Sequence, residues 1–106
     1  MKMSVLHLTP ENFKSTVENA SVPVLVDFFA DWCMPCKMFA PILEKVAEAL
    51  GDKVIIAKIN IDDAEQIAAS YGVMSIPTII LFKDGKETDR NVGAMSAGDL
   101  MNFIGL

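Results

Sequence analysis

The chain has 106 residues, 52% of them hydrophobic, which is enough for one domain with a buried core and argues against a disordered chain. Its formal charge of −5 argues against nucleic acid and anionic membrane surfaces as partners. No run of residues approaches the roughly 18 consecutive apolar positions of a membrane span, and residues 1–8 are too short and interrupted for a signal peptide, so we expect a cytoplasmic, single-domain protein over residues 1–106.

The first part of the chain predicts two strands with one helix between them. Residues 3–8 are a candidate strand, and a helix is expected from Thr9, as its N-cap, to about residue 19. The run 24–29 is apolar on both faces except for Asp27. That pattern is typical of a strand in the middle of a parallel sheet with helices on both sides.

The next helix and strand continue this alternation. We expect Asp31 to cap a helix whose apolar residues recur at helical spacing until Gly51 ends it, and we expect Pro41 to kink that helix. Residues 54–61 then repeat the buried-strand pattern, with Lys58 as the one charge inside it.

The rest of the chain predicts a helix, a hairpin and a final helix. A helix over residues 63–71 precedes a strand over 77–82, and the Asp-Gly pair in the turn 83–86 predicts a tight hairpin into 87–92. Ser96 and the aspartate three residues after it resemble a capping box. This motif predicts the start of a helix that runs nearly to the end of the chain. This order of elements implies an α/β fold in which helices enclose a mixed sheet.

Both cysteines of the chain lie three residues apart, where the strand 24–29 gives way to a helix. Residues at this spacing on a helix have Cβ atoms about 5–6 Å apart, and a disulfide needs about 3.5–4.5 Å, so the first turn must tighten a little to close the bond. A loop this small adds only about 2 kcal/mol of stability. The spacing therefore predicts a reversible dithiol rather than a structural staple.

The two sulfurs are expected to play different roles. Cys33 falls at the start of the helix, where unpaired backbone N–H groups and the helix dipole favour a thiolate, so we assign it as the nucleophile. Cys36 lies one turn inside the helix and is placed to attack a mixed disulfide formed at Cys33. Pro35 stiffens the turn at a position where a missing N–H costs little.

A metal site is the sharpest competing interpretation of the two cysteines. A structural zinc site needs four ligands, and the only other strong soft candidate is His7. A haem attachment would need histidine directly after the second cysteine, and Lys37 stands there. We therefore expect no metal and no bound cofactor, only a redox-active disulfide between Cys33 and Cys36.

Several short stretches, in this order and spacing, resemble the thioredoxin family over essentially the full length of the chain. They are residues 24–29 with Asp27, residues 32–37, Pro41, Lys58, residues 75–78, residues 83–85 and residues 92–94. The resemblance implies a thioredoxin fold, with a central mixed five-stranded sheet flanked by four helices. It also implies the activity of a protein-disulfide reductase that works by thiol–disulfide exchange.

Two charged residues in the predicted strands match the family's charged pair behind the cysteines. Burial should raise the pKa of Asp27 and let it exchange a proton near neutral pH, and the family counterpart is the acid/base for the buried cysteine. Lys58 resembles the charge partner of that aspartate. The alternatives are that Asp27 only satisfies nearby backbone donors and that Lys58 extends out to water from the strand edge.

The pair Ile76-Pro77 matches the cis-proline that lies against the cysteines in the family. Only proline makes a cis bond cheap, and a residue without an N–H leaves the backbone of Ile76 free to pair with an extended substrate segment. The alternative is an ordinary trans proline that opens a strand.

Small and apolar residues around the cysteines match the surface on which the family docks its substrates. We call this set the docking rim: Trp32, Met34, Met74, Ile76, Gly93 and Ala94. Met34 replaces the glycine found in most members and is expected to affect the redox potential and the fit to substrates and reductase. Met74 stands at a position that varies in the family and is expected to affect partner choice. Without the resemblance, Trp32 and Met34 could be ordinary packing residues.

These observations predict a monomeric cytoplasmic reductase of disulfides in other proteins, recharged by a thioredoxin reductase and ultimately by NADPH. No nucleic acid or membrane partner is expected. Two alternatives remain open at this point: a thioredoxin-fold binding subunit whose redox state is incidental, and an oxidase or isomerase that runs the same chemistry in reverse.

Overall fold

Five strands form one mixed sheet in the computed structural model, which describes residues 4–106. The strand order is β1-β3-β2-β4-β5, in which β1, β3 and β2 are parallel, β4 is antiparallel to β2, and β5 is antiparallel to β4. The strands are β1 (Val5–Leu8), β2 (Val24–Phe29), β3 (Ile55–Asn60), β4 (Thr78–Lys83) and β5 (Lys86–Val92). The helices are α1 (Phe13–Asn19), α2 (Met34–Leu50), α3 (Glu65–Ser70) and α4 (Ala97–Ile104), with 3-10 turns at Gly51–Lys53 and Ile61–Asp63.

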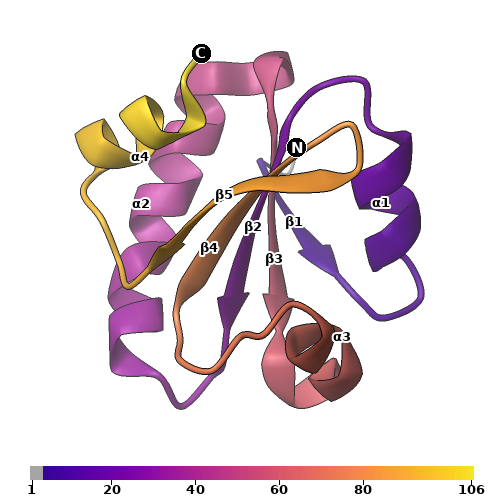
Figure 1. Cartoon of the computed structure of the whole chain (residues 1–106). Coiled ribbons are helices and arrows are strands. Elements are labelled where there is room, and N and C mark those ends of the chain that lie inside the picture. Colours follow the sequence, from indigo (N-terminus) through magenta and orange to yellow (C-terminus); the bar gives the residue numbers. More distant parts are fainter. Residues whose placement is uncertain (1–3) are drawn as a thin grey trace.

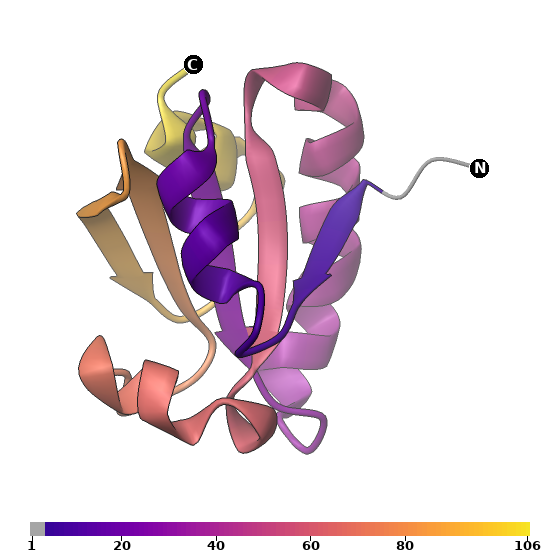
Figure 2. The ribbon, with the colours of Figure 1, turned by 90° about the vertical axis from the view of Figure 1, so that its right-hand side faces the viewer.

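Helices cover both faces of this sheet, so the predicted thioredoxin fold of α/β class is confirmed. Figure 1 shows α2 and α4 on one side of the strands and α1 and α3 on the other, and Figure 2 shows the strands in their sheet order with α1 in front. Each face has its own core. The core under α2 and α4 includes Leu25, Phe39, Leu43, Ile79 and Leu100, and the core under α1 and α3 includes Val17, Phe28, Ala57, Ala68 and Ile80.

The central strand β2 determines where the reactive end of α2 lies. β2 pairs with β3 on one side and β4 on the other, and its first five residues are buried. Because side chains alternate along a strand, Asp27 shares the α2 face with Leu25, while Val26 and Phe28 face α1 and α3. The one charge in this strand therefore projects toward the helix that carries the cysteines.

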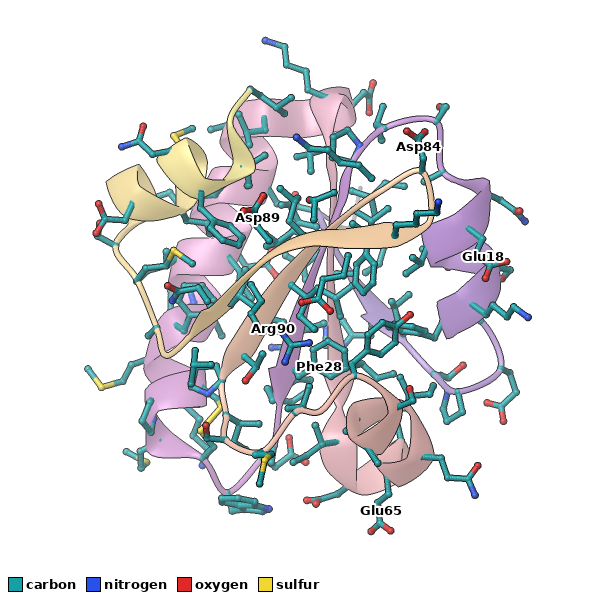
Figure 3. The ribbon with its side chains drawn as sticks, in the orientation of Figure 1. Glu18, Phe28, Glu65, Asp84, Asp89 and Arg90 are labelled. Atoms are coloured by element: carbon teal, nitrogen blue, oxygen red, sulfur yellow. A yellow bond between two sulfur atoms is a disulfide. The ribbon has the colours of Figure 1, made fainter. Side chains whose placement is uncertain are left out.

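Aromatic rings fill the core under α1 and α3. Phe13, Phe28, Tyr71 and Phe82 form a set of tilted and edge-on pairs with centroids 5.4–6.3 Å apart. Arg90 of β5 extends toward this face (Figure 3), where it pairs with Glu87 at 2.7 Å and donates to the backbone carbonyl of Tyr71 at 2.6 Å. These contacts connect the edge strand to the segment that follows α3.

The first two elements begin later than the sequence predicts. Met3, in the predicted first strand, lies outside the described residues, and β1 starts at Val5. Thr9 is not the N-cap of α1: its carbonyl accepts from the N–H groups of Asn12 and Phe13, and Asn12 is the cap residue. A turn thus precedes the helix, because the Asn12 side chain accepts from the Thr9 N–H at 2.8 Å and closes it.

The later elements follow the prediction closely. α2 continues through Pro41, and the 3-10 turn at Ile61–Asp63 shortens α3 at its start. Asp84 and Gly85 both have positive φ, as the tight hairpin turn requires, and Ser96 caps α4 by accepting from the Asp99 N–H at 3.1 Å. Among residues 4–106, no helix has the length and apolarity needed to cross a membrane.

Two leucines test this division between core and surface. Leu25 is completely buried in the centre of the sheet, and Leu6 on the edge strand β1 is 40% exposed. We expect Leu25→Ala to lower the free energy of unfolding by about 3 kcal/mol, because it removes apolar contacts and leaves a cavity. Leu6→Ala, the matched control, is expected to lower it by less than about 1 kcal/mol. Urea unfolding measures both, and equal losses would contradict this description of the core.

Candidate active site

The two cysteines form a disulfide across the first turn of α2. Their Cα atoms are 5.2 Å apart, and both side chains are almost completely buried. Cys33 is the N-cap residue, and its Sγ accepts a hydrogen bond from the backbone N–H of Cys36 at 3.2 Å. A helix start has unpaired N–H groups that favour negative charge, so the same donor is available to a thiolate on Cys33 after reduction.

Asp31 does not cap this helix, which corrects the sequence prediction. The cap position belongs to Cys33, and Pro35 occupies the first turn, where its missing N–H leaves no hydrogen bond unmade. Asp31 lies in the loop before the helix, and its carboxylate accepts from the Asn60 side-chain amide at 3.4 Å. Asp31 belongs to this loop and not to the helix, because β2 ends at Phe29 and the chain must reverse direction before α2 begins at Met34.

A second loop fixes the indole beside the disulfide. The Trp32 Nε1–H donates to the Asp62 carboxylate at 2.9 Å, and the Asp62 N–H in turn donates to the Asn60 side-chain oxygen at 2.9 Å. Asp62 belongs to the 3-10 turn that follows β3. The loops after the parallel neighbours β2 and β3 are therefore joined by side-chain hydrogen bonds.

Asp27 is a buried acid in the central strand β2. Its side chain has no exposed surface, and neither carboxylate oxygen has a partner among the described residues. Its pKa is raised from 3.8 to about 7, because the effect of burial exceeds the opposing effect of the positive charge of Lys58. The carboxyl group can therefore gain or lose a proton near neutral pH.

Lys58 lies opposite Asp27 in the register of β2 and β3, but its ammonium group is held elsewhere. Its Nζ lies 4.3 Å from the centroid of the Phe29 ring, in a cation–π contact. Phe29 belongs to the same face of β2 as Asp27, so the ammonium stays near the carboxylate without a hydrogen bond to it. This arrangement explains why the charge of Lys58 lowers the pKa of Asp27 less than burial raises it.

The segment before β4 packs against the disulfide. The Ile76–Pro77 peptide bond is cis, and Cys33 Sγ lies 3.9 Å from the Ile76 carbonyl oxygen. The Gly93 N–H donates to the Pro77 carbonyl at 2.8 Å, which brings the end of β5 to the same place. Gly93 has φ of 106°, a conformation that favours glycine.

The residues of the docking rim differ in how far they are exposed. Trp32, Met34 and Ala94 are exposed, whereas Ile76 and Gly93 are half-buried. Met74 is 95% exposed in the loop between α3 and β4, two residues before Ile76. The structure brings Ile76 to the sulfur of Cys33 and Gly93 to Pro77, and Met34 and Ala94 line one common groove.

Comparisons with known proteins agree with this geometry. A family model described as thioredoxin matches residues 4–105. The chain belongs to the thioredoxin family. It is 46% identical over 100 residues to a thioredoxin of Haemophilus influenzae, with 94% of each chain covered, and 43% identical over 104 residues to one of Acidithiobacillus ferridurans, with 98% and 96% covered. Thioredoxin 1 of Synechococcus elongatus is 44% identical over 97 residues, with 92% and 91% covered.

Family membership and the disulfide together make this protein a thiol–disulfide oxidoreductase. The redox group is the Cys33–Cys36 pair itself. Within residues 4–106 there is no cluster of three or more histidine, cysteine or acidic side chains that could hold a metal ion.

Sequence reasoning missed two members of the site, Asn60 and Asp62. Both lie at the carboxyl end of β3, whose parallel neighbour β2 leads into the cysteine loop. Polar residues that follow neighbouring parallel strands meet at one edge of the sheet, so their position after a predicted buried strand was the available signal. Which of them would bond the indole depends on side-chain geometry that the sequence does not contain.

The pKa of Asp27 predicts a pH dependence of stability in the oxidised protein, where no thiol titrates. The folded-state pKa of about 7 lies above the unfolded value of 3.8, so the folded protein holds an extra proton between these limits and stability falls as pH rises through them. At about 1.4 kcal/mol per pKa unit, the fall is on the order of 4 kcal/mol. Asp27→Asn should remove this fall in urea unfolding from pH 4 to 8, and the exposed control Asp63→Asn should keep it. An unchanged slope in Asp27→Asn would contradict the burial effect.

Removing the charge of Lys58 tests its influence on the carboxylate. In Lys58→Met, the pKa of Asp27 should rise further above 7, because the one charge that lowers it is gone. Carbon-13 NMR of the Asp27 carboxyl group in the oxidised protein measures this directly. Lys53→Met, at the opposite end of β3, serves as the control and should leave the titration in place. A lower pKa in Lys58→Met would refute the assigned direction.

Proposed function

We propose that this protein reduces disulfides in other proteins by two successive thiol–disulfide exchanges, with Cys33 as the nucleophile and Cys36 as the resolving thiol. The observation that carries the proposal is the position of Cys33 at the N-cap of α2, with the Cys36 N–H donating to its sulfur at 3.2 Å. A donor already aimed at that sulfur stabilises a thiolate without rearrangement. Cys36, one turn inside the helix, is within bonding reach of the same sulfur.

The chemistry begins from the reduced protein. The Cys33 thiolate attacks one sulfur of the substrate disulfide, whose S–S bond breaks, and the other substrate sulfur leaves as a thiolate that takes up a proton. Cys36 then loses its proton and attacks the Cys33 sulfur. The Cys33–Cys36 bond forms, the second substrate sulfur leaves as a thiolate, and two electrons have passed from the protein to the substrate.

In this proposal Asp27 accepts the proton that Cys36 releases. Its pKa of about 7 matches a proton exchange near neutral pH, and its oxygens have no other hydrogen-bond partner among the residues described. A surface cavity of about 300 Å³ reaches both Cys36 and Lys58, and it offers water a route to this region. Lys58 acts as the charge partner that keeps the carboxylate from becoming too basic.

The docking rim would receive the substrate. Trp32, Met34 and Met74 offer exposed apolar surface, and the backbone of the half-buried Ile76 would pair with an extended segment. Disulfide-bearing proteins are the substrates that the family implies, and a thioredoxin reductase is the expected electron donor. We further propose that the protein is a monomer that acts in the cytoplasm, where a reducing environment suits a reversible dithiol.

Variants of the two cysteines separate their proposed roles. Cys33→Ser should abolish reduction of insulin in a dithiothreitol-coupled assay, because the attacking thiolate is lost. Cys36→Ser should still attack but stall as a mixed disulfide, which mass spectrometry of the intact protein would detect. Insulin reduction at the parental rate by Cys33→Ser would contradict the assignment.

The direction of the reaction has its own test. The exchange is reversible, so the same dithiol would act as an oxidant if its reduction potential were high. Equilibration with a glutathione buffer, followed by thiol counting, should give a potential below that of the buffer, as a reductase requires. A potential well above it would assign the protein to the oxidases or isomerases.

A further inference from the structure

Three side chains behind the disulfide form one group on the α2 face of the sheet. Asp27 and Phe29 are two residues apart on β2, so they point to the same face, and Lys58 lies opposite Asp27 in the register with β3. Phe29 and Lys58 are half-buried and line the cavity that also reaches Cys36, whereas Asp27 has no exposed surface. The group therefore connects the buried acid to the proposed resolving cysteine.

The ammonium group of Lys58 has two acceptors within reach. Neighbouring strands lie about 4.8 Å apart, and the lysine stem is long and flexible, so Nζ can reach either the carboxylate of Asp27 or the ring of Phe29. Nζ lies over the ring, 4.3 Å from its centroid, and neither oxygen of Asp27 has a hydrogen-bond partner among the described residues. The ring and the carboxylate thus compete for one cation, and the ring holds it.

Other polar groups near Asp27 have less influence on its charge. On β4, the residues paired with this part of β2 are 78–80, which carry no charge. The other titratable or charged groups that line the cavity are Asp31 in the loop before α2, and Cys36 and Lys37 in α2. Asp31 and Lys37 are exposed, so water screens their charges. Lys58 is the charge that lowers the pKa of Asp27, and the position of this one ammonium is therefore decisive.

We propose that Phe29 is a positioning residue, whose ring holds the Lys58 ammonium away from Asp27 and so keeps the carboxylate free to accept the proton of Cys36. The inference rests on the proposed function, in which Asp27 takes that proton. An ammonium bonded to the carboxylate would favour the ionised form and make it a weaker proton acceptor. Phe29 touches neither the substrate nor the reacting sulfurs in this proposal, and it acts through Lys58 alone.

Two substitutions of Phe29 test this role. Phe29→Leu removes the ring and keeps an apolar side chain, and Phe29→Trp keeps an aromatic face. In Phe29→Leu, the pKa of Asp27 should fall by about one pH unit or more, because the released ammonium can bond the carboxylate. In Phe29→Trp, the pKa should stay near the parental value, since an indole ring binds a cation at least as well as a phenyl ring. Carbon-13 NMR of the Asp27 carboxyl group in the oxidised protein measures both.

A protein that already carries Lys58→Met separates this effect from a change in burial. If the ring acts only through the ammonium, adding Phe29→Leu to Lys58→Met should leave the pKa of Asp27 unchanged. Phe103→Leu is the matched control, because it removes another half-buried ring, which packs against the core under α2 and α4. This control should also leave the pKa of Asp27 at the parental value.

The consequence for catalysis is measured on the mixed disulfide. Reduced protein is mixed at pH 8, where Asp27 is largely ionised, with a peptide whose cysteine is bonded to thionitrobenzoate. Acid quenching and mass spectrometry of the intact protein then follow the intermediate in which the peptide is attached to Cys33. This intermediate should persist several times longer in Phe29→Leu than in the parent and in Phe29→Trp, because a weaker base takes the proton of Cys36 less readily.

Three results would overturn the inference. In Phe29→Leu, an Asp27 pKa that stays the same or rises would show that the ammonium remains in place or moves out to water. An equal fall of the pKa in the Lys58→Met background would assign the effect to burial. A lowered pKa with an unchanged lifetime of the mixed disulfide would refute Asp27 as the proton acceptor, and with it the catalytic part of this inference. Insulin reduction by the parent tests the proposed exchange separately, and the NMR results do not depend on it.

Discussion

The hydrogen bond from the Cys36 N–H to the Cys33 sulfur is the contact on which the chemistry of this fold depends. Helices usually begin with an oxygen-bearing side chain that accepts from the first free N–H groups. Here a cysteine takes that role, so the free N–H groups of the helix favour negative charge on the sulfur that we propose as the attacking thiolate. The buried sheet keeps this helix start in place, because β2 is paired on both sides and leads directly into the cysteine loop.

Asp27 shows how the same fold tolerates a group that ordinary core packing would exclude. A carboxylate in the central strand with no hydrogen-bond partner among the described residues destabilises the ionised protein, and a close ion pair would relieve this effect. The Phe29 ring instead holds the Lys58 ammonium at 4.3 Å. The carboxyl group consequently stays able to titrate near neutral pH, which a tight ion pair would prevent. The proposed role of Asp27 as proton acceptor uses this same buried carboxyl group, whose ionised form lowers the stability of the protein.

Local patterns in the sequence predicted the order of the elements, the central position of β2 and the reversible dithiol, because each of these depends on neighbouring residues. The errors occurred where a distant contact decides the outcome. Asp31 has the chemistry of a helix cap, yet it bonds Asn60, which lies 29 residues away in the sequence, at the end of β3. The Trp32–Asp62 bond joins two loops that only the parallel pairing of β2 and β3 brings together. The roles of the docking rim and of Asp27 and Lys58 remain predictions that biochemical tests must decide.

The bond between Trp32 and Asp62 has a practical consequence. Trp32 is the one tryptophan of the chain, and it lies 66% exposed next to the reacting pair, with its ring held by the loop after β3. All tryptophan fluorescence of the protein therefore comes from a residue beside the two cysteines. A bound polypeptide that strips water from the ring would move this emission to shorter wavelengths, so the protein contains its own optical sensor of substrate engagement, without an added label.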